Sequence, residues 1–223
     1  MFIYGVPASP FVQRVLMAGR AKGHEVELRP MPGMALDSPE FQAISPMGRI
    51  PLLELDDGTH ICESSAIAAY LDEVLDGPAL LPANLVARAR VREIEAVATL
   101  EYVTGIRPLM VHKVWGRPGG DEVVTAARAI AAKATDVLDK MLARSTAFAV
   151  GDRITHADCI LAPALNLALI VDRMAETAAL VRERPNLSAY FDRMAADPVA
   201  GRSIAEMTAA FTAMLARAAQ AKG

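Results

Sequence analysis

The secondary-structure pattern of the chain changes at Gly77-Pro78, just before Leu80-Leu81-Pro82. Up to this break, short runs with strand character alternate with stretches whose apolar residues recur at the helical period. Beyond it, the residues have the composition and period of helices almost throughout. The sequence therefore predicts two successive domains: a mixed α+β domain over 1–77 and an all-helical domain over 85–223, joined by a linker at 78–84.

The first domain is predicted to have the element order β-α-β-α-β-β-α. Gly23 ends its first helix as a left-handed stop, and Ser38-Pro39 begins a short helix as a cap followed by proline. Asp56-Asp57-Gly58 supplies the turn of a hairpin. The expected elements are a strand at 1–6, a helix at 10–22, a strand at 24–29, a short helix from 39 to 44, a hairpin at 51–62 and a helix at 64–75. This order, with its short connections, resembles a thioredoxin-type fold.

The second domain is predicted to contain helices only. Its long first helix is expected to kink or break at Pro108, because proline lacks the N–H that a helix interior requires. Thr155 and Asp158 form a capping box that should start a buried central helix. The expected helices cover 85–115, 122–144, 159–171, 176–184, 186–196 and 201–220, with residues 116–120 ending the first.

The composition describes a soluble globular protein. Hydrophobic residues make up 53% of the chain, charged residues 22%, and the formal net charge is −3. Because the sequence has no basic stripe, this net charge gives no electrostatic reason to expect a nucleic-acid partner. Apolar runs are interrupted by charges before about 18 residues, and the N-terminus lacks the basic start of a secretory signal. We therefore expect no membrane span and a cytoplasmic protein.

The cysteines and histidines show no pattern of a metal or redox site. Cys62 and Cys159 lie far apart, so a reducing compartment suits them. For each cysteine, the role of a small buried hydrophobic residue is favoured over that of a reactive thiol. The four histidines share no spacing with carboxylates or cysteines, and no metal site is predicted.

Residues 47–65 combine an X-Pro bond at the mouth of the hairpin with a helix start. Pro51 cannot donate a backbone N–H, and Ile50 is driven toward extended geometry, which leaves main chain for a peptide-like ligand to pair with. Helix N-termini attract carboxylates, so Glu63-Ser64 could hold an anionic end of the same ligand. The alternative is structural: a helix cap, a favourable first-turn acid and an edge strand.

Ser9 precedes Pro10 at the start of the first helix, where an N-cap role alone would explain it. The functional alternative is that its hydroxyl holds the thiol of a ligand as a thiolate. A free thiol has a pKa of about 8.5, so lowering it by roughly two units requires about 2.7 kcal/mol of thiolate stabilisation. One hydrogen bond to a charged group contributes roughly 1.5 to 3 kcal/mol and a helix terminus a further fraction. In this role Ser9 is a donor and not a nucleophile.

These motifs resemble those of cytosolic glutathione transferases over essentially the full length of the chain. The SPF motif is similar to that of the serine-type, tau-like class, whereas the omega-like class has cysteine in its place. The resemblance implies glutathione as co-substrate, a small apolar electrophile as second substrate and a homodimer. It is carried by SPFVQR at 9–14, GRIPLLE at 48–54, ESSAIAAYLDE at 63–73, the linker ending in LLP, and THADCILAP at 155–163.

The resemblance also implies roles for individual residues. Ser9 would activate the glutathione thiol, and Ile50, before a cis Pro51, would bind the cysteinyl backbone. Glu63 and Ser64 would bind the γ-glutamyl end. The implied glutathione site is completed by Phe11, Arg14 and Arg49.

Three positions depart from the family pattern, and one residue has two interpretations. Arg49 replaces the more usual lysine and keeps the charge, and Ser45 stands where asparagine is common. Asp37 lies where a basic residue would be expected for the glycyl carboxylate. Arg14 could be a cation beside the ligand or a charge on the helix surface.

The family architecture implies an electrophile site between the first domain and the long first helix of the second, with the C-terminal helix as a partial lid. The alternative is that the same apolar residues are ordinary helix-packing core. The residues concerned are Tyr102, Ile106, Met110, Trp115, Met207 and Phe211.

Three functions follow from these features. The leading hypothesis is a glutathione transferase that conjugates the glutathione thiolate to an apolar electrophile. A glutathione-dependent isomerase or peroxidase on the same fold is the first alternative, since each needs only an activated thiolate. The second is a non-catalytic protein that binds hydrophobic ligands, which Asp37 favours.

Overall fold

The structure is a computed structural model that describes residues 1–115 and 120–220. It contains two compact units: residues 1–80 together with the chain from Ala205 onward, and residues 81–204. The division inferred from the sequence places the residues from 205 onward in the helical domain. In the structure, most of the C-terminal helix groups with the mixed unit instead.

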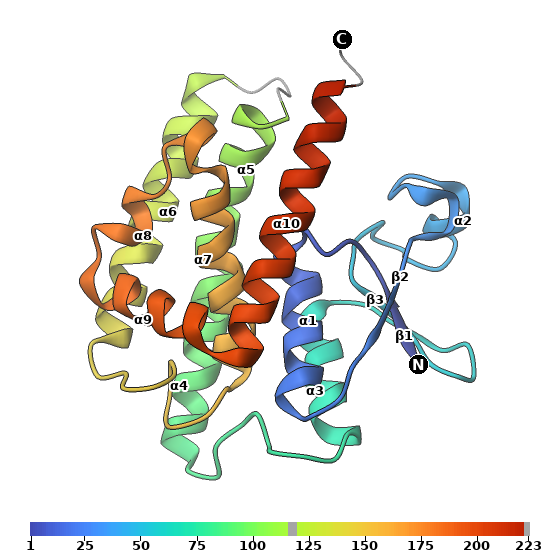
Figure 1. The fold of residues 1–223 in the computed structure, drawn as a ribbon, viewed down its shortest axis with the longest axis horizontal. Helices are drawn as coiled ribbons and strands as arrows, with labels where there is room; N and C mark the ends of the chain where they lie inside the picture. Colours follow the sequence, from blue (N-terminus) through green and yellow to red (C-terminus); the bar gives the residue numbers. More distant parts are fainter. Residues whose placement is uncertain (116–119, 221–223) are drawn as a thin grey trace. The chain divides into compact units, whose positions relative to one another are not determined.

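The first unit is built on a four-stranded mixed sheet (Figure 1). Its elements are β1 (Phe2–Tyr4), α1 (Pro10–Ala21), β2 (Glu27–Arg29), the 3-10 turn η1 (Pro32–Met34), α2 (Pro39–Gln42), β3 (Leu52–Glu54), β4 (His60–Ile61) and α3 (Ser64–Val74). The strand order is β2-β1-β3-β4. β1 pairs in parallel with β2 and antiparallel with β3, and β3 pairs antiparallel with β4. The predicted order β-α-β-α-β-β-α is confirmed, with η1 as an addition.

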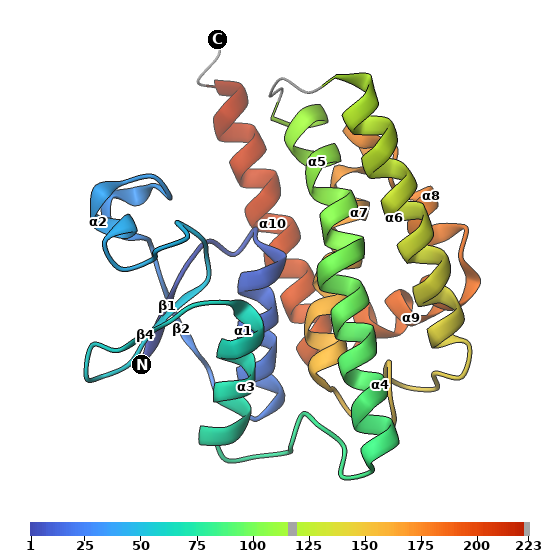
Figure 2. The ribbon, with the colours of Figure 1, turned by 180° about the vertical axis from the view of Figure 1, so that it is seen from behind.

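Helices α1 and α3 lie side by side on one face of this sheet, and α2 lies on the other (Figure 2). Neighbouring residues of a strand point to opposite faces, so Leu53 and Leu52 enter different cores. Leu53 packs with Ile3 and with apolar residues of α1 and α3, while Leu52 packs with Phe41 and Met31. The start of α1 and the start of α3 are thereby fixed to one rigid layer.

The pattern break at Gly77 is a tight turn against the end of α1. Gly77 has a φ of 117°, and a β-carbon there would lie 2.3 Å from the carbonyl oxygen of Lys22. The Asp72 carboxylate accepts a hydrogen bond from Lys22 Nζ at 3.0 Å and another from the backbone N–H of Leu80 at 3.0 Å. Glycine is required because other residues tolerate neither this backbone conformation nor this close approach.

The second unit is helical, as predicted. Its elements are α4 (Leu85–Ala96), the π-helical segment η2 (Val97–Tyr102), α5 (Val103–Lys113), α6 (Asp121–Leu142), α7 (His156–Ala175), α8 (Ala179–Arg182), α9 (Pro185–Ala196) and the first residues of α10 (Pro198–Gln220). Within the described ranges, no helix is long and apolar enough to cross a membrane.

An interruption of the helix at Pro108 is wrong, because α5 continues through Pro108 to Lys113, while the kink given as the other possibility stays a prediction. The regular α-helix is instead interrupted earlier, at η2, where π-helical hydrogen bonds add a residue to the turn. The expected helix at 176–184 is shortened to α8, because Glu176 adopts a left-handed conformation with φ 51° that ends α7. The stop predicted at 116–120 lies, apart from Gly120, outside the described residues.

The predicted capping box at the start of α7 is confirmed. The Asp158 carboxylate accepts hydrogen bonds from the N–H and hydroxyl of Thr155, from the Ala149 N–H and from the Tyr190 hydroxyl, at 2.8 to 2.9 Å. Burial raises the pKa of Asp158, and these four donors oppose the shift. One carboxylate therefore joins α7, α9 and the loop before α7.

Replacing Asp158 with alanine leaves these buried donors without an acceptor. We expect the free energy of unfolding of Asp158→Ala to fall by about 3 kcal/mol or more, measured by urea denaturation. Asp152→Ala is the matched control, because the Asp152 side chain is 91% exposed. A loss within about 0.5 kcal/mol of the control would contradict a structural role for the carboxylate.

Candidate functional site

Ser9 lies at the N-terminal end of α1, after the loop that leaves β1. Its backbone is extended, with φ −85° and ψ 127°, and its Oγ accepts a hydrogen bond from the Val12 N–H at 3.4 Å. Pro10 begins the helix, so the predicted N-cap is confirmed. The Ser9 hydroxyl proton has no acceptor among the described residues. An available O–H donor at a helix N-terminus can stabilise a negatively charged sulfur atom.

A hydrogen bond from Gln13 stabilises the loop that carries Ser9. This side chain is completely buried, and its Nε2 donates to the carbonyl oxygen of Pro7 at 2.8 Å. The Ser9 N–H donates to the Val6 carbonyl oxygen at 3.1 Å, which closes the same loop. Sequence reasoning missed Gln13. The signal that could have found it is a polar residue on the buried face of an apolar helix.

A second part of the candidate site is the main chain before β3. The Ile50-Pro51 bond is cis, as the resemblance implied. Ser45 is buried, and its Oγ both donates to the Arg49 carbonyl oxygen at 3.1 Å and accepts from the Arg49 N–H at 3.2 Å. Ser45 thus fixes the segment that presents Ile50, a role that sequence reasoning did not assign to it.

The third part is the N-terminal end of α3. Glu63 precedes this helix with a φ of 67°, a conformation that non-glycine residues rarely adopt, and its side chain caps no N–H within the described chain. Ser64 is the first helical residue and is buried. The first backbone N–H groups of α3 are thus available to bind a carboxylate.

Arg14 lies beneath this helix start. It is 0% exposed, and its Nη1 donates to Ser64 Oγ at 3.4 Å. Of the two interpretations of Arg14, a charge on the helix surface is therefore wrong. Phe11 is half-buried in the first turn of α1, and the Arg49 side chain is exposed. Direct contact of these three residues with a ligand stays a prediction.

No basic residue occurs between positions 30 and 48, and Asp37 is exposed. An exposed aspartate repels a carboxylate. A ligand carboxylate that lies near residues 30–48 would thus have to be bound by Arg49 or by backbone N–H groups.

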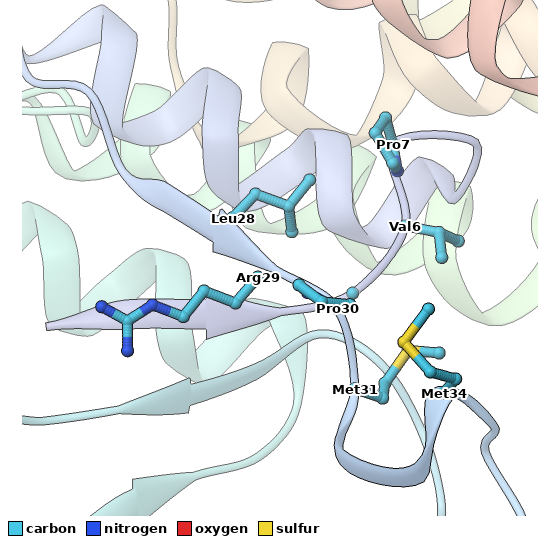
Figure 3. Close-up of a pocket in the computed structure, with 8 residues that line it drawn as sticks. Val6, Pro7, Leu28, Arg29, Pro30, Met31 and Met34 are labelled. Carbon is cyan, nitrogen blue, oxygen red and sulfur yellow. The ribbon is translucent and has the colours of Figure 1, made fainter.

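A hollow of about 350 Å³ opens beside the Ser9 loop (Figure 3). Val6 and Pro7 of this loop form one wall, and Met31 and Met34 approach them from the segment after β2. The Arg29 side chain extends away from these residues. Sequence reasoning missed this apolar hollow, although two methionines close together in MPGM at 31–34 are a recognisable signal.

Five of the six residues predicted for the electrophile site lie in helices, and Trp115 lies in the turn after α5. Tyr102 and Ile106 are completely buried in the second unit, and Met110 and Trp115 are half-buried there. Burial raises the pKa of Tyr102 far above its ordinary value. In the first unit, Met207 and Phe211 are 0% and 1% exposed. Their grouping into one electrophile site stays a prediction.

Family models match both units of the chain. The model for the N-terminal domain of glutathione S-transferases covers residues 3–79, and the model for the C-terminal domain covers 121–193.

Relatives of this chain carry isomerase names. Maleylacetoacetate isomerase of Rattus norvegicus is 35% identical over 156 residues, which is 67% of this chain and 69% of the relative. Probable maleylacetoacetate isomerase 1 of Drosophila melanogaster is 35% identical over 130 residues, or 58% of this chain and 51% of the relative. The chain thus spans about half the length of the fly relative and about two thirds of the rat one.

Similar folds occur among solved structures. Maleylacetoacetate isomerase from Methylobacterium extorquens AM1, with bound malonate and glutathione, superposes with a TM-score of 0.74 at 25% identity, over 93% of this chain and 97% of that one. Glutathione transferase F7 from Populus trichocarpa gives a TM-score of 0.76 at 28% identity, over 92% and 98% of the two chains.

The two cysteines should react slowly with alkylating reagents. Burial, and then the negative charge of Glu63, raise the pKa of the half-buried Cys62 thiol, and Cys159 is 0% exposed. We expect native Cys62 to be alkylated by iodoacetamide at pH 7 at least about tenfold more slowly than free cysteine, because its thiolate is scarcer. Cys159 should react only after unfolding. Mass spectrometry of wild type and Cys62→Ala checks both, and fast native labelling of either cysteine would contradict this.

Proposed function

Because this chain belongs to the glutathione S-transferase family, we propose that it activates glutathione at Ser9 and isomerises an alkene conjugated to a carbonyl group. The observation that carries the proposal is the Ser9 hydroxyl at the start of α1, with its proton available. The relatives named maleylacetoacetate isomerase support isomerisation over other uses of the thiolate. Glutathione is the co-substrate, since members of this family use it.

The glutathione thiol is proposed to meet Ser9. A hydrogen bond from the hydroxyl, aided by the N-terminal end of α1, lowers the pKa of the thiol by roughly two units from about 8.5. Most of the bound glutathione is then thiolate at pH 7. Pro7 and Gln13 hold the loop, so this donor is positioned before the ligand arrives.

The rest of glutathione is proposed to extend from Ser9 along two backbone sites. The backbone of Ile50 pairs with the cysteinyl part, in a segment fixed by Ser45. The γ-glutamyl carboxylate binds the first N–H groups of α3 at Glu63 and Ser64, with Arg14 beneath them. Arg49 is the basic residue nearest in sequence to Ile50, and its side chain is proposed to bind the glycyl carboxylate.

The proposed isomerisation needs no redox step. The thiolate adds to one alkene carbon, and the electron pair of the double bond moves onto the carbonyl oxygen as an enolate. Rotation about the new single bond follows, and the enolate collapses to expel the thiolate. Glutathione is regenerated, and the alkene returns with the other geometry.

Conjugation is the second candidate function, and the apolar hollow beside the Ser9 loop favours it. Met31, Met34 and Val6 can receive the apolar part of an electrophile such as an aryl halide. Attack by the thiolate then expels halide and leaves a stable thioether.

A homodimer and a cytoplasmic location remain part of the proposal. Leu85 and Val86 at the start of α4 are 74% and 71% exposed, and exposed apolar residues are common at interfaces. Light scattering should give a mass near twice 23.8 kDa.

The role of Ser9 is tested by Ser9→Ala. If the hydroxyl lowers the thiol pKa by about two units, its removal reduces the thiolate fraction at pH 7 from about 76% to about 3%, and the rate falls about 25-fold. The loss should shrink as the pH rises toward 9, because the thiol then ionises unaided. The measurement is the glutathione-dependent rate with a cis-enedione and with an aryl halide, each from pH 6 to 9.

Ser38→Ala is the matched control for Ser9→Ala. Ser38 caps α2 in the same way, before a proline and with its Oγ accepting the Phe41 N–H at 3.2 Å. Its loss should lower stability by about 1 kcal/mol without changing the pH profile. An identical pH profile for wild type and Ser9→Ala would refute thiol activation by Ser9. Faster turnover of the aryl halide than of the enedione would favour conjugation.

The role of Arg14 is tested separately by binding. We expect Arg14→Gln to raise the glutathione Kd about tenfold, since Ser64 and the start of α3 lose a buried hydrogen-bond donor. The thiol pKa of the bound glutathione should stay as in wild type, because Ser9 is untouched. Calorimetric titration measures the first quantity and thiolate absorbance the second. An unchanged Kd in a folded variant would remove Arg14 from the proposal.

A further inference from the structure

Met34 departs from two local preferences at once. Its side chain is 75% exposed, although burial is what stabilises an apolar side chain. Its backbone has a φ of 60°, in the left-handed region that residues other than glycine rarely adopt, and Gly33 before it has a φ of 66°. Exposed apolar residues are common singly, but a residue that is also held in an unfavourable backbone conformation points to a role beyond folding.

The turn that carries Met34 places its side chain at the hollow beside the Ser9 loop (Figure 3). The Met34 N–H donates to the Met31 carbonyl oxygen at 2.9 Å, so the unusual backbone belongs to a hydrogen-bonded turn. Both methionines line the hollow, but Met31 is only 9% exposed. The hollow is therefore bordered by one thioether that is open to solvent and one that is buried.

The two thioethers differ in their access to an oxidant dissolved in water. When a peroxide oxidises methionine, the sulfur attacks one peroxide oxygen, the O–O bond breaks and an S–O bond forms. The products are methionine sulfoxide and water, or an alcohol from an organic hydroperoxide. The sulfur loses two electrons and the peroxide gains them. Because the sulfur and the peroxide must touch, this reaction should favour Met34 over Met31.

Oxidation of Met34 changes the hollow without disturbing the core. The sulfoxide is polar, and it replaces part of an otherwise apolar wall. At Met34 the new oxygen can stay hydrated, because the side chain is exposed. At Met31 the same oxygen would be buried in a cluster with Phe41 and Leu52, where no water satisfies it. Met34 is thus a position where oxidation alters a binding surface and leaves the protein folded.

We propose that Met34 is a peroxide-sensitive switch of this hollow. As a thioether it completes a surface that binds a small apolar molecule, and as a sulfoxide it weakens that binding. The oxidant is hydrogen peroxide or an organic hydroperoxide. Neither state requires glutathione or the Ser9 hydroxyl, so the switch is independent of the proposed isomerase activity.

The first measurement is the rate of oxidation at each methionine, by peptide mass spectrometry after timed exposure to hydrogen peroxide. We expect Met34 to be oxidised at least about tenfold faster than Met31 in the folded protein, and the two rates to converge in urea. The thermal midpoint should be unchanged once Met34 is converted. Equal rates at Met34 and Met31 in the folded protein would overturn the proposal.

The second measurement is binding of N-phenyl-1-naphthylamine, a neutral apolar dye, by fluorescence titration before and after peroxide. We expect the Kd of wild type to rise about threefold to tenfold on oxidation. Met34→Leu keeps an apolar side chain without the sulfur, so its Kd should resemble that of wild type and should not respond to peroxide. Met34→Gln places a polar group at the same position and should bind the dye weakly without peroxide.

Met47→Leu is the matched control, because Met47 is 60% exposed but does not line the hollow. Its dye binding should remain sensitive to peroxide, as in wild type. Equal weakening by peroxide in Met34→Leu and Met47→Leu would overturn the role of Met34. So would an unchanged Kd after conversion of Met34, or failure of unoxidised wild type to bind the dye. None of these outcomes depends on catalysis, so loss of the proposed isomerase activity leaves the test decisive.

Discussion

The first unit depends on three positive charges buried along a single helix. Arg14, Arg20 and the C-cap residue Lys22 all come from α1 and its end, which carries no acidic residue of its own. Arg14 is 0% exposed as a residue, and the side chains of Arg20 and Lys22 are 8% and 2% exposed. A buried cation is costly unless it is paired, so each must find a partner on another segment. Arg14 donates to the start of α3, Arg20 to α10, and Lys22 to the end of α3 through Asp72. The position of α1, and of Ser9 at its start, is thereby set by polar contacts as well as by the sheet it covers.

The residues of the candidate site lie at the ends of helices and strands and not in their middles. Ser9 begins α1, Ile50 precedes β3, and Glu63-Ser64 begin α3. At these points, backbone groups that a helix or sheet would otherwise pair are free to bind a ligand. Gln13 and Ser45 lie behind the first two and fix them through hydrogen bonds to main-chain atoms. The candidate site is therefore preorganised by buried polar side chains, which reduces the cost of ordering it when a ligand binds.

Local signals in the sequence predicted much of this arrangement. Helix caps involve hydrogen bonds between residues only a few positions apart, so their geometry follows from residue type and spacing. The caps predicted in this way are those at Ser9-Pro10, Ser38-Pro39 and Thr155. Two of the features that were missed depend on contacts between distant segments. Glu206 has nothing in its own helix to indicate that it pairs with Arg20, and the hollow beside Met31 and Met34 forms only once β1 and β2 pair. The interruption expected at Pro108 also depends on more than local sequence. Residue propensity indicates where a helix is weak, but packing and the π-helical turn determine where the regular α-helix is interrupted.

A serine donor suits reversible chemistry. Lowering the pKa of a thiol increases the thiolate fraction, but it also reduces nucleophilicity and makes the thiolate a better leaving group. The optimum attacking thiol has a pKa near the ambient pH, and a shift of roughly two units from about 8.5 brings glutathione close to that value. An adduct that carries an adjacent carbonyl can then expel the thiolate again, and isomerisation results. An adduct formed by loss of halide has no such route, and the thioether remains. If Ser9 activates the thiol as proposed, both reactions start from the same thiolate, and the electrophile determines which one is completed.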